Sequence, residues 1–260
     1  MSAPNDPTQL FRLDGKVALV TGGSRGLGKE MVLAFARSGA DVVIASRKEE
    51  ACALLAKEVE NETGRRALAV GAHVGKWADN ENLAKRALDH FGKVDVLVNN
   101  AGMSPTYASV VDITEALYDK VMDVNLKGPF RLSCVLGEAM KDGDGGSIMF
   151  VSSTAAVQAS PAEVPYGAAK SGLHSLTKSL SRTFAPKVRV NCIMPGAFLT
   201  DISNAWPKEM HAALERIVPL QRGGAPNEIV GAALYLASDA SAYTTGSVVK
   251  IDGGLAYDMG

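Results

Sequence analysis

Short apolar runs alternate with longer amphipathic segments along the whole chain of 260 residues. The apolar runs are rich in valine and isoleucine, which is typical of strands buried on both faces of a sheet. The longer segments carry apolar residues at helical spacing, and this βαβ rhythm favours a parallel sheet. We predict strands at residues 16–21, 41–46, 67–71, 94–99, 147–151, 188–193 and 247–251. We predict helices at residues 26–38, 48–62, 79–91, 114–140 with a break, 165–184, 201–216 and 226–238.

A glycine-rich turn joins the first predicted strand to the first predicted helix, at residues 22–28. Glycines let the backbone turn tightly and approach a ligand, and the free N–H groups of a helix start favour phosphate. The unit predicts a dinucleotide site on an α/β fold: a single-domain, Rossmann-type, doubly wound seven-stranded parallel sheet flanked by helices. The candidate cofactor contacts in this turn are Gly22, Ser24, Arg25, Gly26, Leu27 and Gly28.

A nucleoside-triphosphate loop is the rival interpretation of the same turn. Gly23 through Lys29 fits its spacing, but the next position should be Ser or Thr to hold magnesium. Glu30 stands there and would repel phosphate. The triphosphate interpretation is therefore disfavoured.

The end of the second predicted strand indicates which dinucleotide binds. An acidic residue at this place would hold the adenosine ribose hydroxyls, but the chain has Ser46 followed by Arg47. Arg25 lies in the glycine turn, and arginine binds phosphate in a bidentate manner. We therefore expect NADP(H) to be favoured over NAD(H), with Arg25, Ser46 and Arg47 near the 2′-phosphate. The alternative is that both arginines lie in solvent.

A tyrosine and a lysine four residues apart, Tyr166 and Lys170, fall on one face of a predicted helix. The ammonium should favour the phenolate and lower the tyrosine pKa below its usual ~10. Ser153, thirteen residues upstream of Tyr166, could hold a carbonyl or alkoxide oxygen against this acid. The set predicts proton transfer for an alcohol/carbonyl pair. A surface Tyr-Lys pair is the alternative for this motif taken alone.

Composition limits the remaining function classes. A net charge of −1 gives no electrostatic reason to expect nucleic acid or an anionic membrane as partner. The three cysteines, Cys52, Cys134 and Cys192, are scattered and predict neither a metal site nor disulfides, so we expect a cytoplasmic protein. We see no secretory signal and no apolar stretch of about 18 residues.

The order and spacing of these motifs closely resemble the classical short-chain dehydrogenase/reductase family, from about residue 12 to residue 254. The resemblance rests on the glycine turn after Thr21, on Asn99-Asn-Ala-Gly102, and on Asn125 within Val-Asn-Leu-Lys-Gly. It also rests on the Ser153/Tyr166/Lys170 set, on Pro195-Gly196-x-x-x-Thr200, and on Asp252-Gly-Gly254. It implies an NAD(P)-dependent oxidoreductase that acts on a small alcohol or carbonyl substrate and forms an oligomer, a tetramer or a dimer.

The resemblance also implies roles for individual residues. Tyr166 would be the general acid/base, Lys170 would bind the nicotinamide ribose, Ser153 would hold the substrate oxygen, and Asn125 would hold a relay water. From the sequence alone, an asparagine at a helix start is more often a cap or bend. Val74 would contact adenine, whereas the preceding His73 departs from the usual acidic residue. Further cofactor contacts implied are Asn99, Ala101, Gly102, Pro195, Gly196 and Thr200.

Substrate and domain details remain as expectations. The leading function is interconversion of a secondary alcohol and a ketone. The alternatives are 3-oxoacyl-(acyl-carrier-protein) reductase, sugar or polyol dehydrogenase, and a non-catalytic cofactor-binding sensor. We expect Asp142 and Asp144 at the active-site rim, where they would repel an acidic carrier protein. We expect a flexible arm at residues 1–10, one domain over 11–260, and a substrate lid near 197–224 with Trp206, Met210, Leu214, Ile217 and Leu220.

Overall fold

The fold is seen in a computed structural model that describes residues 6–201, 203 and 208–256. Seven parallel strands form one sheet in the order β3-β2-β1-β4-β5-β6-β7. This confirms the predicted doubly wound seven-stranded sheet. The strands are β1 (Val17–Thr21), β2 (Asp41–Ser46), β3 (Ala67–Gly71), β4 (Val96–Asn99), β5 (Gly146–Val151), β6 (Val188–Pro195) and β7 (Val248–Ile251).

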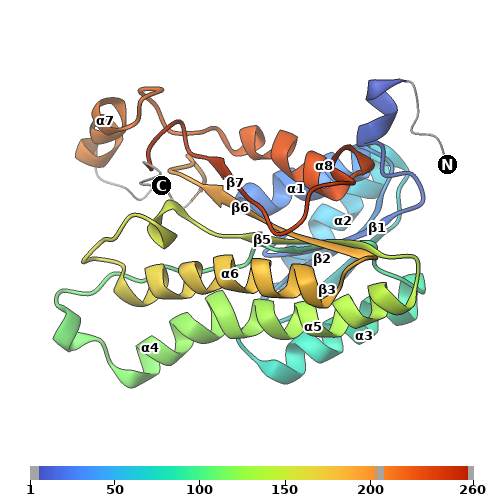
Figure 1. Cartoon of the computed structure of the whole chain (residues 1–260), viewed down its shortest axis with the longest axis horizontal. Helices are drawn as coiled ribbons and strands as arrows, with labels where there is room; N and C mark the ends of the chain where they lie inside the picture. The colour runs from blue at the N-terminus through green and yellow to red at the C-terminus, as the bar shows by residue number, and fades with distance from the viewer. Residues whose placement is uncertain (1–5, 202, 204–207, 257–260) are drawn as a thin grey trace.

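Helices cover both faces of the sheet (Figure 1). One layer contains α1 (Gly26–Arg37), α2 (Glu49–Thr63) and α8 (Val230–Ala237). The other contains α3 (Trp77–Phe91), α5 (Gly128–Asp142) and α6 (Val164–Thr183). Two further helices, α4 (Glu115–Met122) and α7 (Lys208–Ile217), lie beyond the carboxyl ends of the strands.

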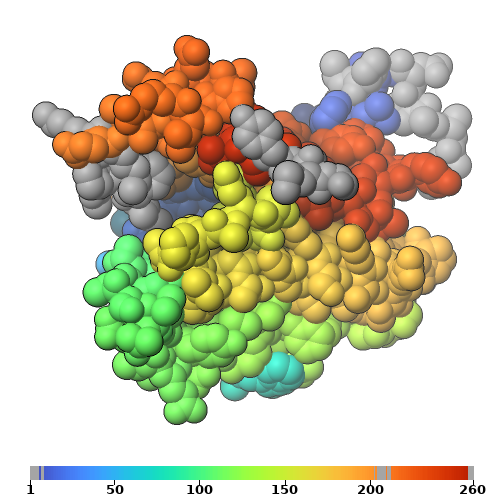
Figure 2. Space-filling model, turned by 60° about the vertical axis from the view of Figure 1, so that its left-hand side comes forward, coloured from blue at the N-terminus to red at the C-terminus, as the bar shows by residue number. Residues whose placement is uncertain are grey.

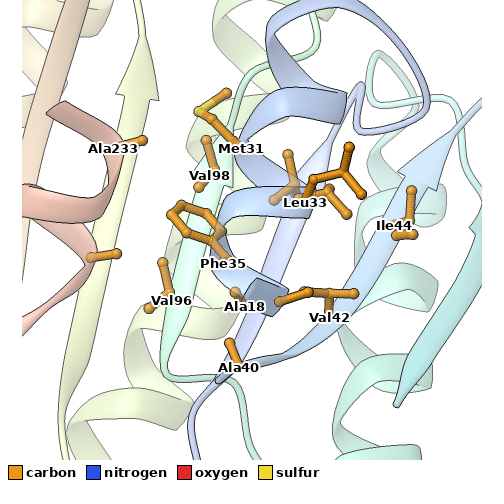
Figure 3. Packing of buried hydrophobic residues seen from close by; sticks show 14 of the residues in the cluster. Ala18, Met31, Leu33, Phe35, Ala40, Val42, Ile44, Val96, Val98 and Ala233 are labelled. Carbon is orange, nitrogen blue, oxygen red and sulfur yellow. The ribbon is translucent and has the colours of Figure 1, made fainter. Parts of the chain in front are cut away.

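Each layer buries its own apolar core against the sheet. In the first layer Phe35 of α1 is fully buried and packs with Val96 and Val98 of β4 (Figure 3). All five residues of β1 are buried, as expected for a central strand with helices on both sides. Burying an aromatic side chain of this size contributes roughly 1.5–3 kcal/mol. The apolar runs in the sequence are therefore the strands themselves.

The chain reverses its direction of travel across the sheet between β1 and β4. From β1 it proceeds outward to β3, and then it crosses back to β4 on the other side of β1. In open α/β sheets ligands bind at the carboxyl ends of the strands beside such a switch point. The topology therefore places a ligand site beside the glycine turn.

The long helix predicted at residues 114–140 is interrupted, as expected, but by a specific element. A π-helix, Asp123–Lys127, joins α4 to α5. Single π turns inside helices are frequent at functional sites. Asn125 lies within this turn, so its side chain is displaced from the position that a continuous α-helix would give it.

Two ends of the predicted elements differ from the structure. The helix predicted at 201–216 begins at Lys208 among the described residues. Part of the expected N-terminal arm, Pro7–Phe11, is a 3-10 helix beside α8 and the 3-10 helix Asp239–Ser241, whereas residues 1–5 lie outside the described part. A search of the described helices for one with the length and apolarity of a membrane span finds none.

Candidate active site

The site is assembled at the carboxyl ends of the central strands. Ser153 follows β5, Tyr166 and Lys170 lie in the first two turns of α6, and the glycine turn follows β1. The segment that carries α4 and the segment leading into α6 lie next to each other below α7 (Figure 2). The parallel topology therefore brings together groups that are far apart in the sequence.

Tyr166 and Lys170 share one helix face, as predicted. The ammonium nitrogen lies 5.5 Å from the centroid of the tyrosine ring. The Ser153 hydroxyl lies near enough to the Tyr166 phenol to lower its pKa, and its oxygen accepts a hydrogen bond from the Ala155 N–H at 3.2 Å. The phenol and the serine hydroxyl are therefore close enough to act on one substrate oxygen.

The tyrosine pKa differs from the expectation. Burial raises the pKa of Tyr166 to about 12; the hydrogen bond from Ser153 opposes this, and the negative charge of Glu163 adds to it. Lys170 does not lower the pKa because its ammonium lies over the ring face and donates to the Val151 carbonyl at 2.8 Å. The prediction of a lowered pKa is wrong for this arrangement, in which the phenol is neutral and ready to donate.

Lys170 is itself deeply buried, with 3% of its surface exposed. This burial lowers the pKa of its ammonium to about 8. The buried hydroxyl of Ser152 donates to the Lys170 carbonyl at 3.3 Å, so this serine supports the helix. Ser153, not Ser152, therefore faces the reacting groups.

Asn125 fixes the loop that follows β4. Its amide oxygen accepts from the Met103 N–H at 3.1 Å, and its amide nitrogen donates to the Met103 carbonyl at 2.8 Å and the Val121 carbonyl at 2.9 Å. A Cβ on Gly102 would lie 3.0 Å from Asn125 Oδ1 and 3.4 Å from Lys170 Nζ. Gly102, Asn125 and Lys170 thus lie close together.

The glycine turn has the shape needed to receive a dinucleotide phosphate. Gly22 and Gly26 have φ of 64° and 53°, which glycine adopts most readily. A Cβ on Gly28 would lie only 2.2 Å from the Gly22 carbonyl oxygen. No side chain caps the start of α1 at Arg25, so its first N–H groups can face an anion. Ser24 and Leu27 flank these N–H groups and are half-buried.

Thr21 and Asn100 hold this turn, and neither was among the predicted contacts. Thr21 Oγ1 accepts from the N–H groups of Asn100 at 3.0 Å and Ala101 at 3.1 Å. The Asn100 amide donates to the carbonyls of Thr21 at 2.9 Å and Gly22 at 3.2 Å. The signal in the sequence was a pair of polar residues at the ends of two neighbouring apolar strands.

The Asn99 side chain points away from the glycine turn. Its buried amide donates to the Ser133 hydroxyl of α5 at 2.9 Å. Because successive residues of a strand alternate between faces, Asn99 points into the helical layer and Asn100 toward the glycine turn. The Asn99 side chain therefore joins the sheet to α5, so a cofactor contact of Asn99 would come from its backbone, whereas Ala101 and Gly102 lie in the loop facing the site.

The residues expected at the adenosine end lie together. The Ser24 hydroxyl donates to the Ser46 hydroxyl at 3.1 Å and ties the glycine turn to β2. The exposed guanidinium groups of Arg25 and Arg47 make no ion pair with any described residue. Their free charges and this serine pair fit a phosphorylated ribose.

The end of β3 is shaped by His73. Its ring nitrogen Nδ1 accepts a hydrogen bond from the Gly75 N–H at 3.2 Å. The backbone N–H of His73 donates to the Asp79 carboxylate at 3.0 Å. These bonds form the turn that presents the half-buried Val74. Within the described part of the chain no cluster of three or more His, Cys, Asp or Glu residues could hold a metal.

The segment expected as a lid begins at the end of β6. A Cβ on Gly196 would lie 2.8 Å from Asp252 Cα, so only glycine fits after Pro195. At the base of this segment the Leu199 N–H donates a hydrogen bond to the Gly224 carbonyl oxygen, with a nitrogen–oxygen distance of 2.8 Å. A Cβ on Gly26 would lie 3.6 Å from the Thr200 side chain, so Thr200 faces the phosphate turn.

Inside this segment Leu214 is buried, while Ile217 and Leu220 are exposed. Trp206 and the Met210 side chain lie outside the described residues.

A hollow opens beside Tyr166 between α4 and the start of α6. The sequence analysis did not predict this hollow, because it brings together α4, the start of α6 and the loop that follows β4. Its lining residues are Pro105, Tyr107, Leu117, Val121, Glu163, Pro165 and Tyr166.

Asp142 and Asp144 lie at the opposite edge of the sheet. They belong to the connection from α5 to the first residue of β5, where the Lys187 ammonium donates to the Gly143 carbonyl at 3.1 Å. The amino ends of the strands meet at this edge, away from Tyr166. The expectation that these acids would repel an acidic carrier protein at the active-site rim is wrong.

Known proteins resemble this chain over nearly its whole length. A family model described as enoyl-(acyl carrier protein) reductase matches residues 22–256. The human dehydrogenase/reductase SDR family member 4 is 36% identical over 259 residues, 97% of this chain and 91% of that protein.

Two solved structures share the fold closely. The gluconate 5-dehydrogenase of Burkholderia cenocepacia, in complex with NADP and tartrate, is 32% identical, with a TM-score of 0.91 over 96% of this chain and 98% of that one. A 7α-hydroxysteroid dehydrogenase complexed with NADH is 30% identical, with a TM-score of 0.92 over 98% and 100%. With this fold, this site and these relatives, the chain belongs to the short-chain dehydrogenase/reductase family of NAD(P)-dependent oxidoreductases.

Proposed function

We propose that the protein interconverts a secondary alcohol and a ketone with NADP(H), and that Tyr166 is the general acid/base. The observation that carries the proposal is the neutral, half-buried Tyr166, whose phenol lies near Ser153 and beside a small apolar hollow. A phenol in this state can donate a proton to a carbonyl oxygen that gains charge. The hydroxyl of Ser153 can donate a hydrogen bond to the same oxygen.

The bound nicotinamide supplies a hydride to the carbonyl carbon or accepts one from the alcohol. Gly22, Gly26, Gly28 and Thr200 would hold its phosphates, while Lys170 would hold the nicotinamide ribose. Further contacts would come from Val74, Ala101, Gly102, Pro195 and Gly196.

Proton supply follows from the surroundings of Tyr166. In reduction its proton moves to the substrate oxygen and leaves a phenolate, and the ammonium of Lys170 lies over the same ring, 5.5 Å from its centroid. Asn125, which meets Lys170 at Gly102, would hold a water that returns the proton from solvent. In oxidation the phenolate takes the proton of the alcohol.

The NADP(H) preference is supported by Arg25 and Arg47, whose charges are unpaired among the described residues. Ser46 leaves room for a phosphate where a carboxylate would bind ribose hydroxyls and repel the phosphate. The NADP-bound gluconate 5-dehydrogenase supports this choice, and the NADH-bound steroid dehydrogenase shows that a close structural relative can use the other cofactor.

A second candidate is reduction of an acyl group carried by an acyl-carrier protein. The description of the matching family favours this candidate. Asp142 and Asp144 do not oppose it, because they lie at the opposite edge of the sheet from Tyr166. A sugar or polyol substrate is the third candidate, given the resemblance to gluconate 5-dehydrogenase.

The decisive test measures oxidation of NADPH and NADH with a panel of ketones, 3-oxoacyl thioesters and sugar ketones, and reduction of NADP and NAD with the alcohols. The proposal expects turnover of simple ketones, with NADPH preferred. Tight NADPH binding without turnover of any carbonyl would favour the sensor instead. Turnover confined to carrier-protein thioesters or to sugars would favour the second or third candidate.

We also propose a cytoplasmic homo-oligomer, a tetramer or dimer. Buried free thiols at Cys52 and Cys192 suit a reducing compartment. The α4–α5 surface exposes Tyr118 and Phe130, which a second subunit would cover. Light scattering coupled to size-exclusion chromatography should give a mass above one chain.

A further inference from the structure

The carboxyl end of β3 lies at the outer end of the proposed cofactor site. Ser46, the last residue of β2, pairs with Gly71, the last residue of β3, and the Ala72 N–H donates to the Ser46 carbonyl at 2.9 Å. In the sheet order β3-β2-β1, the phosphate turn follows β1 and the ribose position follows β2. The next strand end outward carries His73, which places this residue beside the base that the ribose bears.

The hydrogen bonds of His73 fix which ring nitrogen carries its hydrogen. Nδ1 accepts from the Gly75 N–H at 3.2 Å, so the neutral ring has its hydrogen on Nε2. Nε2 has no hydrogen-bond partner among the described residues, and the His73 side chain is half-buried. A Cβ on Gly75 would lie 3.0 Å from His73 Cε1, so a larger residue would crowd the ring. His73 therefore presents a free donor, Nε2–H.

The acceptors in the same turn are bonded within the protein. The His73 carbonyl accepts from the Lys76 N–H at 2.8 Å. The Val74 carbonyl accepts from the Asn80 amide at 2.7 Å, and the Asp79 carboxylate accepts from the His73 backbone N–H at 3.0 Å. The Val74 N–H, in contrast, donates to no residue that the structure describes. The turn therefore offers a base two free donors.

We infer that His73 makes the adenine end of the cofactor site bind the base through a donor. The edge of adenine farthest from the ribose carries the ring nitrogen N1, an acceptor, beside the 6-amino group, a donor. Nε2–H of His73 suits N1 and cannot accept from the amino group, whereas an acidic side chain at this place would accept from it. The protein should therefore bind a cofactor whose base lacks the 6-amino group as well as it binds NADPH. This inference deepens the proposed function and rests on its cofactor.

Two analogues of NADPH separate the two groups on the base. Purine in place of adenine removes the 6-amino group and keeps N1, whereas 1-deazaadenine keeps the amino group and replaces N1 with C–H. We would measure the Kd of NADPH and of both analogues by nicotinamide fluorescence in the wild-type protein, in His73→Asp and in His90→Asp.

The two variants are matched in chemistry and differ in place. An aspartate at residue 73 can still accept from the Gly75 N–H, as aspartates do in turns, so the turn is kept. His90 is exposed at the C-terminal end of α3, whereas His73 precedes the start of this helix. His90→Asp therefore controls for the exchange of a histidine for an acid elsewhere on the surface.

The wild-type protein should bind the purine analogue within about twofold of NADPH. It should bind the 1-deazaadenine analogue about three- to tenfold more weakly, which is the usual weight of a hydrogen bond between neutral groups. In His73→Asp, loss of the 6-amino group should weaken binding about tenfold or more, because a hydrogen bond to a carboxylate is stronger. His90→Asp should keep the wild-type ratios.

Three results would overturn the inference and leave the proposed function in place. In the wild-type protein they are a purine analogue bound about tenfold more weakly than NADPH, or a 1-deazaadenine analogue bound as tightly as NADPH. The third is equal binding of NADPH and the purine analogue by His73→Asp. The wild-type ratios test the inference by themselves if this variant does not fold.

Failure of the proposed function gives a different result. The ratios are measured by binding, so absence of turnover with every carbonyl would contradict the proposed function without changing them. Tighter binding of NADH than of NADPH would contradict the cofactor preference. Analogues of NADH with the same two bases would then test His73 in the same way.

Discussion

The two sides of the active-site edge are built differently. On the cofactor side, strand ends are bound to one another: Thr21 and Asn100 join β1 to β4, and Gly28 approaches Gly22 too closely for any other residue. On the substrate side, a small apolar hollow lies between α4, the start of α6 and the loop that carries Pro105 and Tyr107, and the Ser104 hydroxyl of this loop donates to Glu163. Rigid strand ends can preserve one cofactor chemistry, whereas connecting segments can change substrate without altering the sheet.

Tyr166 lies on the border of these two sides, and its hydroxyl should matter most. Tyr166→Phe should reduce kcat/KM about 10²–10⁴-fold, the usual cost of losing a positioned acid/base. NADPH binding, measured by fluorescence titration, should be kept because the ring remains. Tyr107→Phe is the matched control: it removes a hydroxyl that only braces the substrate wall. If kcat/KM fell by a similar factor in Tyr166→Phe and Tyr107→Phe, the special role of the Tyr166 hydroxyl would be contradicted.

Ser152 and Ser153, which are adjacent in the sequence, test which hydroxyl binds the substrate oxygen. Ser153→Ala should lower kcat about 10²-fold because it removes a donor to the substrate oxygen. Ser152→Ala should mainly reduce the free energy of unfolding, by about 0.5–1.5 kcal/mol, because its hydroxyl binds the Lys170 carbonyl. Turnover assays and chemical denaturation measure the two effects. A larger kinetic loss in Ser152→Ala would reverse our assignment.

The cofactor side is tested by Arg47→Ala. Loss of a charge-assisted phosphate contact costs roughly 1.5–3 kcal/mol, which weakens NADPH binding by an order of magnitude or more. NADH lacks the 2′-phosphate, so its Kd in the same variant should stay the same. Calorimetric titration of both cofactors checks this. Equal affinity of the wild-type protein for NADH and NADPH would remove the basis of the preference.

The smallest effect should come from Glu163 on the acid itself. Its negative charge raises the pKa of Tyr166, so Glu163→Gln should lower that pKa, by less than about one unit. The alkaline fall in the reduction rate should then begin at a lower pH than in the wild-type protein. A shift to higher pH would show that Glu163 does not act on the phenol through its charge.

The sequence predicts the cofactor side better than the substrate side, for a physical reason. The strands are buried on both faces, so their apolar runs stand out, and the close approach at Gly28 leaves only glycine. Side-chain direction is harder to foresee: Asn99 and Asn100 are adjacent, and only the strand pleat sends one to α5 and the other to the glycine turn. The spacing of the motifs also does not predict that Asp142 lies near the amino ends of the strands, away from Tyr166.

Electrostatic details depend on packing that no motif encodes. The four-residue spacing placed Lys170 beside Tyr166 correctly, but the ammonium binds the Val151 carbonyl instead of facing the phenol oxygen. Glu163 precedes the motif by three residues and bears on Tyr166 only because α6 begins at the hollow. Both effects required the three-dimensional arrangement.

The central claim is that the proton of the reaction comes from Tyr166, and the pH dependence of kcat/KM in both directions tests it most directly. Reduction needs the neutral phenol, so it should be constant at neutral pH and fall as pH rises through the tyrosine pKa. Oxidation needs the phenolate and should rise about tenfold per pH unit below that pKa. Because burial raises the pKa to about 12, both changes should continue above the free-phenol value of ~10. If kcat/KM for reduction and for oxidation changed in the same direction with pH, the account would be contradicted, because another group would then carry the proton.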